Sequence, residues 1–139
     1  MARFLGLSLA ILVLLMGGFT LLLRLDPLAP PSGGLAMQGL ERSQPLPLQF
    51  AAGGWMIETL ALTALFLLIQ GRTGGWLLDG IVTGLIGWTF RGPILVLTVV
   101  SWSRLPPEPW WPLALRWLIL YLACGVILTM IARGVGLRR

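Results

Sequence analysis

Two residues of opposite charge, Glu58 and Arg91, stand inside long apolar segments and are the side chains best placed to do chemistry. A charge at the centre of a membrane helix costs from ~3 to more than ~10 kcal/mol, depending on the reference state. Arg91 should therefore not face lipid, and it needs a carboxylate, a polar cavity or a partner protein. Glu58 occupies the preceding apolar segment. We predict a buried ion pair between them. Its role could be to hold two helices together, to bind an anion through Arg91, or to bind and release a proton at Glu58.

Small residues accompany both charges at helical spacing. A row of three glycines precedes Arg91 at intervals of four, three and four residues, which places all of them on its helix face. Ala51, Gly54, Glu58 and Ala61 follow one another at intervals of three, four and three. Small residues allow helix backbones to approach closely in a membrane. The predicted helix-packing residues are Gly54, Ala61, Gly80, Gly84 and Gly87.

The segments that carry these residues predict an all-α membrane protein. Of the 139 residues, 57% are hydrophobic and 11% are charged, whereas a soluble domain carries about 25% charged residues. A membrane-spanning helix needs ~20 apolar residues. We predict one integral membrane domain, residues 1–139, built as a small polytopic bundle of four transmembrane helices. The predicted spans are residues 4–23, 50–70, 76–101 and 112–132.

The second and third predicted spans must form a tight antiparallel hairpin, because only residues 71–75 connect them. In that hairpin the depths of Glu58 and Arg91 differ by about two residues, or ~3 Å, which an arginine side chain can bridge. Pro93 frees the carbonyl of Thr89 and favours a kink beside Arg91. The first span is expected to be an uncleaved anchor, because its apolar run exceeds the ~7–15 residues of a signal peptide.

The arginines predict the orientation of the bundle. With four spans both termini lie on one side, and that side carries five arginines against three or four on the other. The positive-inside rule then places both termini in the cytoplasm, most simply of a bacterial inner membrane. The arginines are scattered rather than gathered in a stripe, which argues against a nucleic-acid partner. The arginines on the side of the termini are Arg3, Arg72, Arg133, Arg138 and Arg139.

The two predicted non-cytoplasmic loops, residues 24–49 and 102–111, are rich in proline and tryptophan. Residues 35–42 could form a short interfacial helix, and the first loop either docks a partner or simply connects two spans. The tryptophans near these loops form either an aromatic belt at the headgroups or a surface for a cofactor or subunit. The predicted interface residues are Trp55, Trp102, Arg104, Trp110, Trp111 and Trp117, with Arg104 or Arg116 as a stacking partner.

The chain contains no histidine. That excludes a bis-histidine haem, a histidine-ligated chlorophyll and histidine acid–base catalysis within this chain. Cys124 is the lone cysteine and we expect it to pack as a small apolar residue. Asp79 is either a favourable acid at a helix start or a partner of Arg72 or Arg133. We therefore expect no catalytic or metal-binding residues, and leave contact with lipid, quinone or pigment open.

These observations predict a non-catalytic integral membrane subunit of a larger complex, with a structural, assembly or accessory role. A bioenergetic or photosynthetic assembly would suit a chain with so little material outside the membrane. The alternative is a small oligomeric transporter or channel for an ion or solute that uses Glu58 and Arg91. We expect membrane lipids and other membrane subunits as partners.

Overall fold

The computed structural model describes residues 1–25, 48–102 and 110–136. In these residues all regular structure is helical, and four spans are long and apolar enough to cross a membrane. The predicted all-α bundle of four such spans is confirmed. Its elements are α1 (Ala2–Leu25), α3 (Leu48–Ile69), α4 (Trp76–Thr89), the π-helical turn η1 (Phe90–Ile94), α5 (Leu95–Trp102) and α6 (Trp110–Gly134).

The helices begin and end within two residues of the predicted spans. Apolar content predicts the length that can cross a bilayer, whereas backbone hydrogen bonds continue beyond it. Pro112 lies in the first turn of α6, where its missing N–H costs no helical hydrogen bond. Outside the described residues lie the possible helix at 35–42 and the arginines Arg104, Arg138 and Arg139.

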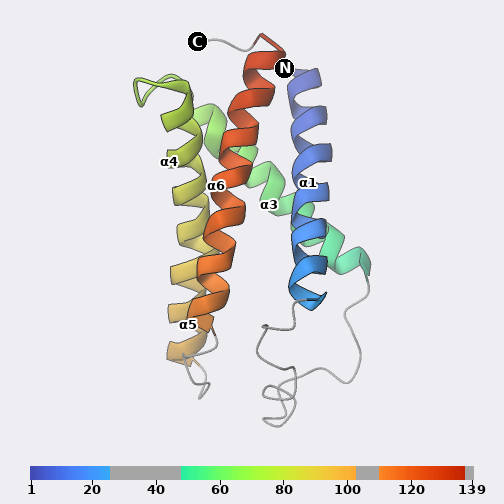
Figure 1. Ribbon diagram of the computed structural model, residues 1–139, viewed down its shortest axis with the longest axis vertical. Helices are drawn as coiled ribbons and strands as arrows, with labels where there is room; N and C mark the ends of the chain where they lie inside the picture. The colour runs from blue at the N-terminus through green and yellow to red at the C-terminus, as the bar shows by residue number, and fades with distance from the viewer. Residues whose placement is uncertain (26–47, 103–109, 137–139) are drawn as a thin grey trace.

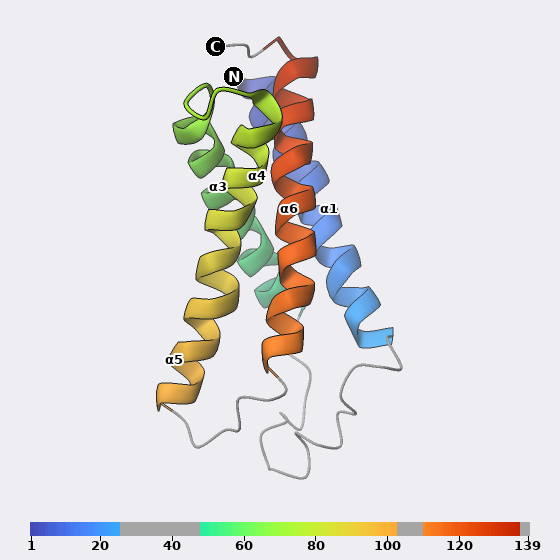
Figure 2. The same cartoon turned by 60° about the vertical axis from the view of Figure 1, so that its left-hand side comes forward.

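The four long helices pack around a common core, in which α3 and α6 contact each other and both contact α1 and α4. The start of α1, the turn between α3 and α4, and the end of α6 lie at one end of the bundle (Figure 1). α4 and α6 lie side by side in both views and share the most extensive interface, while α3 crosses the bundle obliquely (Figures 1 and 2). α1 packs on α3 and α6. In the described part of the chain α5 contacts η1 and α6.

The α3–α4 turn is closed by Asp79. Its carboxylate accepts hydrogen bonds from the Gly71 amide at 2.8 Å, the Thr73 amide at 3.3 Å and the Thr73 hydroxyl at 2.8 Å. Gly71 and Gly74 adopt φ values of 80° and 84°, which glycine tolerates without strain. The tight hairpin predicted from the sequence therefore depends on glycine for its backbone and on Asp79 for its amides.

Asp79 is not in an ion pair with either arginine considered for it. Within the described residues the single ion pair joins Arg91 and Glu58, and Arg133 instead stacks over Trp76. The N–H and O–H donors of the short turn lie within hydrogen-bonding distance of the Asp79 carboxylate. The carboxylate oxygens therefore bond to the turn rather than to a guanidinium.

The α4–α6 interface is a seam of glycines. A Cβ atom at Gly80 would lie 2.7 Å from the Gly125 carbonyl oxygen, and one at Gly84 would lie 2.5 Å from the Tyr121 carbonyl oxygen. A Cβ at Gly87 would meet Leu62 and Tyr121. The predicted packing role of these three α4 glycines agrees with the structure, and their main partner is α6 rather than α3.

Contrary to the prediction, Gly54 and Ala61 on α3 do not pack against another helix among the described residues of this chain. Both are exposed, and a Cβ at Gly54 would meet nothing within 4 Å. α3 instead packs through the larger side chains of Thr59, Leu62 and Phe66, which are buried. Gly54 and Ala61 therefore lie on the outward face of α3, the helix that crosses the bundle obliquely (Figure 1).

Proline widens the third span rather than breaking it. Pro93 lies inside η1, and the Leu95 amide that follows donates to the Gly92 carbonyl. A π-helical turn accommodates the lost hydrogen bond and is common at functional sites. The structure has a π-helical turn where the sequence predicted a kink, and Arg91 itself belongs to η1.

Candidate functional site

The candidate site is a cluster of three polar side chains from three helices. Arg91 Nη1 donates to Glu58 Oε1 at 2.6 Å, forming the predicted ion pair. The Tyr121 hydroxyl donates to the same oxygen at 2.8 Å. Each residue lies near the middle of its span. At that depth a charge is tolerated when it is paired and hydrogen-bonded, which this arrangement provides.

The glycine row on α4 positions this cluster. Gly87 lies one turn before Arg91 and lets Leu62 of α3 and the Tyr121 ring of α6 approach the α4 backbone. With a side chain at that position the three helices could not meet so closely. The glycines and the ion pair are therefore parts of one local structure. The glycines let the helices come close together, and this closeness brings the charged side chains into contact.

The Arg91 guanidinium also stacks on an indole. Its Cζ atom lies 4.4 Å from the centroid of the Trp117 ring. Trp117 is buried and packs edge-on against Phe19 at 5.2 Å and Tyr121 at 6.5 Å between ring centroids. A cation over an aromatic face is attracted to its π-electrons, more strongly where water is excluded. Arg91 is thus held by a carboxylate and an aromatic ring from two different helices.

The ion pair is incompletely covered by the rest of the chain. The Arg91 side chain is 36% exposed and that of Glu58 is 19% exposed. Both line an open groove of about 480 Å³ between α3 and the α4–η1 junction. Its remaining surface is apolar and includes Ala61, Leu68 and Phe90, of which the last two are 62% and 65% exposed. The Glu58–Arg91 pair thus forms a polar patch in the wall of a groove that is otherwise apolar and opens outward.

One acceptor in the cluster has no protein donor. Glu58 Oε2 is buried and forms no hydrogen bond among the described residues, while Oε1 accepts two. An ionised carboxylate has acceptor capacity on both oxygens. The cluster therefore keeps one acceptor for a proton, a water molecule or a donor from outside the chain.

The tryptophans of the predicted aromatic interface differ in their burial. Trp117 is buried in the core and Trp55 packs against Gly17 of α1, so treating both as outward-facing anchors is wrong. Both point inward because they pack against α1, Trp117 on Phe19 and Trp55 at Gly17. Trp111 is 43% exposed and Trp110 is partly buried, so both remain available for contact. Arg104 and the Trp102 side chain lie outside the described residues.

Several residues that build the site were not singled out from the sequence. Tyr121 and Gly125 lie four residues apart, on one face of α6. That pairing was the one pattern in the sequence that could have indicated which face of α6 meets α4. Trp88 donates from its indole N–H to the Ala114 carbonyl at 2.6 Å, tying α4 to α6. Buried threonines on three helices satisfy their hydroxyls on their own backbones, as Thr63 does on the Thr59 carbonyl at 2.7 Å.

Chemically, the site offers a hydrogen-bonded ion pair beside an apolar groove. It can hold helices together and can present donors to a molecule in the groove. Comparisons of the chain with family models, with curated proteins and with solved structures found no match.

Proposed function

We propose that the chain is a non-catalytic integral membrane subunit of a larger membrane complex. The observation that carries the proposal is the incompletely covered ion pair at mid-span. Arg91, 36% exposed, opens on a groove whose other walls are apolar. If the groove faced lipid, the guanidinium would lose hydrogen bonds that no lipid chain replaces. A neighbouring helix in the groove would cover the apolar walls and accept from the remaining guanidinium donors.

We propose that the chain has a structural, assembly or accessory role in that complex. From its composition, we expect the complex to be bioenergetic or photosynthetic. We propose both termini in the cytoplasm of a bacterial inner membrane. This orientation is supported by Arg3, Arg72 and Arg133, which are exposed at the end where α1 begins and α6 ends.

A groove-filling substitution tests the subunit proposal. Ala61 is exposed in the groove, so Ala61→Phe should leave the fold intact and block a neighbouring helix. Ala10 on α1 is also exposed and outside the groove, which makes Ala10→Phe the matched control. After mild-detergent extraction from native membranes, the wild type and Ala10→Phe should migrate in native gels in a complex larger than 15.1 kDa. Ala61→Phe should migrate as a monomer.

Two results would contradict this proposal separately. A wild-type chain that migrates alone after mild extraction would exclude a stable subunit role. A complex that withstands Ala61→Phe as well as Ala10→Phe would show that partners bind elsewhere, and that the groove is not the interface.

The second candidate function is an oligomeric transporter or channel for an ion or solute. The unpaired, buried Glu58 Oε2 favours it, because a carboxylate with a vacant acceptor can bind a proton or a cation. In liposomes, the purified chain should then conduct protons or a monovalent ion, and Glu58→Gln should abolish the flux. Arg3→Gln, which removes an exposed charge at the start of α1, should leave the flux unchanged. An equal flux through wild type and Glu58→Gln would exclude this role for the carboxylate.

A further inference from the structure

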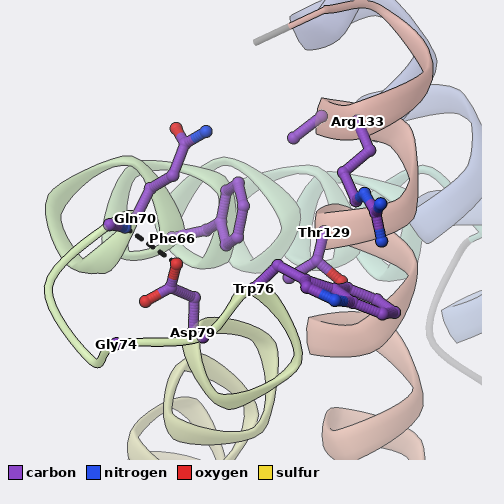
Figure 3. A pocket seen from close by; sticks show the side chains of 10 residues that line it. Phe66, Gln70, Gly74, Trp76, Asp79, Thr129 and Arg133 are labelled. Carbon is purple, nitrogen blue, oxygen red and sulfur yellow. Dashed lines mark hydrogen bonds between the residues drawn. The ribbon is translucent and has the colours of Figure 1, made fainter. Parts of the chain in front are cut away.

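A second pocket of about 480 Å³ opens at the end of the bundle that carries the α3–α4 turn. It lies between that turn and the last turns of α6 (Figure 3). This pocket shares no lining residue with the groove beside Arg91. Its lining combines polar and apolar side chains: Phe66, Gln70, Trp76, Asp79, Thr129 and Arg133.

The cation in this pocket is held on an aromatic ring. The Arg133 Cζ atom lies 4.5 Å from the centroid of the Trp76 ring. Figure 3 shows both side chains on one side of the pocket and Asp79 on the other. Stacking fixes the plane of a guanidinium and leaves its N–H edge available for a second partner.

The carboxylate in the pocket does not neutralise that cation. Asp79 is 4% exposed, and its two oxygens accept from Gly71 and Thr73 in the turn. Among the described residues no hydrogen bond or ion pair occupies the Arg133 guanidinium. The pocket therefore presents an oriented cation, while its anion is engaged by backbone amides and a hydroxyl.

The position of the pocket matches the level of lipid headgroups. It lies where one apolar span ends at Ile69 and the next begins at Trp76. Trp76 is 47% exposed, and tryptophan concentrates at the membrane–water boundary. Arg3 and Arg72 are exposed at the same end, where Asp79 is the sole carboxylate in the described part of the chain. The surroundings of the pocket are therefore positively charged.

We propose that this pocket binds the phosphate of an anionic phospholipid. The Arg133 guanidinium donates to the phosphate oxygens, for which its planar N–H pairs are well matched. The Trp76 ring, 47% exposed, holds the guanidinium in place and offers the apolar surface that receives the glycerol and the first part of an acyl chain. A lipid is favoured over a soluble phosphate because the pocket adjoins the apolar surface of the spans.

Lipid retention on the purified full-length chain tests the site. The probe is phosphatidylglycerol, measured by native mass spectrometry after detergent washing, with phosphatidylcholine as the zwitterionic comparison. Arg133→Gln should reduce phosphatidylglycerol retention roughly fivefold, the effect of one basic side chain near an anionic lipid surface. Arg133→Lys should lose part of the retention, because it keeps the charge but neither the planar donors nor the stacking.

Arg3→Gln is the matched control, since it removes the same charge at the same end but outside the pocket. It should retain phosphatidylglycerol as well as the wild type. Equal losses in Arg3→Gln and Arg133→Gln would overturn the proposal in favour of diffuse attraction to the charged end. Equal retention of phosphatidylcholine, or displacement of the lipid by excess glycerol phosphate, would also overturn it. All variants change exposed arginines, so circular dichroism should report an unchanged helix content.

Discussion

Glu58→Gln is expected to destabilise the bundle by about 3 kcal/mol, the lower end of the ~3–5 kcal/mol measured when one partner of a buried ion pair is removed. The lower end applies because glutamine can still accept a hydrogen bond from Arg91 and Tyr121, and because the Arg91 side chain is 36% exposed. What is lost is the charge that compensates Arg91 at mid-span. The measurement is the free energy of unfolding in mixed detergent micelles, followed by circular dichroism as the denaturing detergent is increased.

The double variant Glu58→Gln with Arg91→Gln should cost less than the sum of the single variants. With both charges gone, neither is left uncompensated, so the coupling energy should reach at least ~1 kcal/mol. Arg3→Gln serves as the control, because it removes an exposed charge from α1 and should change stability by less than ~0.5 kcal/mol. Strictly additive losses from Glu58→Gln and Arg91→Gln would show that the contact of 2.6 Å does not couple the two residues.

Gly125→Ala is expected to separate α4 from α6. An added Cβ would overlap the Gly80 carbonyl oxygen, and it would also lie 3.0 Å from the Gly84 amide nitrogen. The neighbours here are backbone atoms, which cannot rotate away as a side chain can. Overpacking costs typically ~1–3 kcal/mol, and a backbone contact places this substitution at the upper end. Detergent unfolding should show this loss, and Gly84→Ala should behave in the same way.

Gly53→Ala on α3 is the matched control for the helix seam. A Cβ at Gly53 would meet nothing within 4 Å, so alanine should be neutral or slightly stabilising through its higher helix propensity. Because Trp88, Tyr121 and Trp117 surround the seam, near-UV circular dichroism should also change in Gly125→Ala and remain the same in Gly53→Ala. Equal stability of the two alanine variants would refute close backbone packing between α4 and α6.

The sequence predicted the ion pair because helix spacing and antiparallel depth are local geometry. Once the short 71–75 turn forces a hairpin, the depths of Glu58 and Arg91 follow from the rise per residue. The side on which α6 lies does not follow from either span. For that reason the third member of the cluster, Tyr121, and the indole of Trp117 beneath the guanidinium could not be assigned.

The packing stripes show the same limit. Rows of small residues occur on both α3 and α4, and the sequence treats them alike. Only the row on α4 finds a partner with its own glycine, Gly125, at the matching height. On α3, Gly54 and Ala61 are exposed, and that helix meets its neighbours through larger side chains.

The sequence alone determined the helical class, the four spans, the hairpin and the pairing of two charges. Each of these follows from the length of the hydrophobic segments and from residue spacing. The tertiary structure decided which small residues touch another backbone and which tryptophans are buried. It also decided that Asp79 serves the turn rather than an arginine. These depend on the crossing of helices that are far apart in the chain, and crossing is set by the fit of whole helix surfaces rather than by any local pattern.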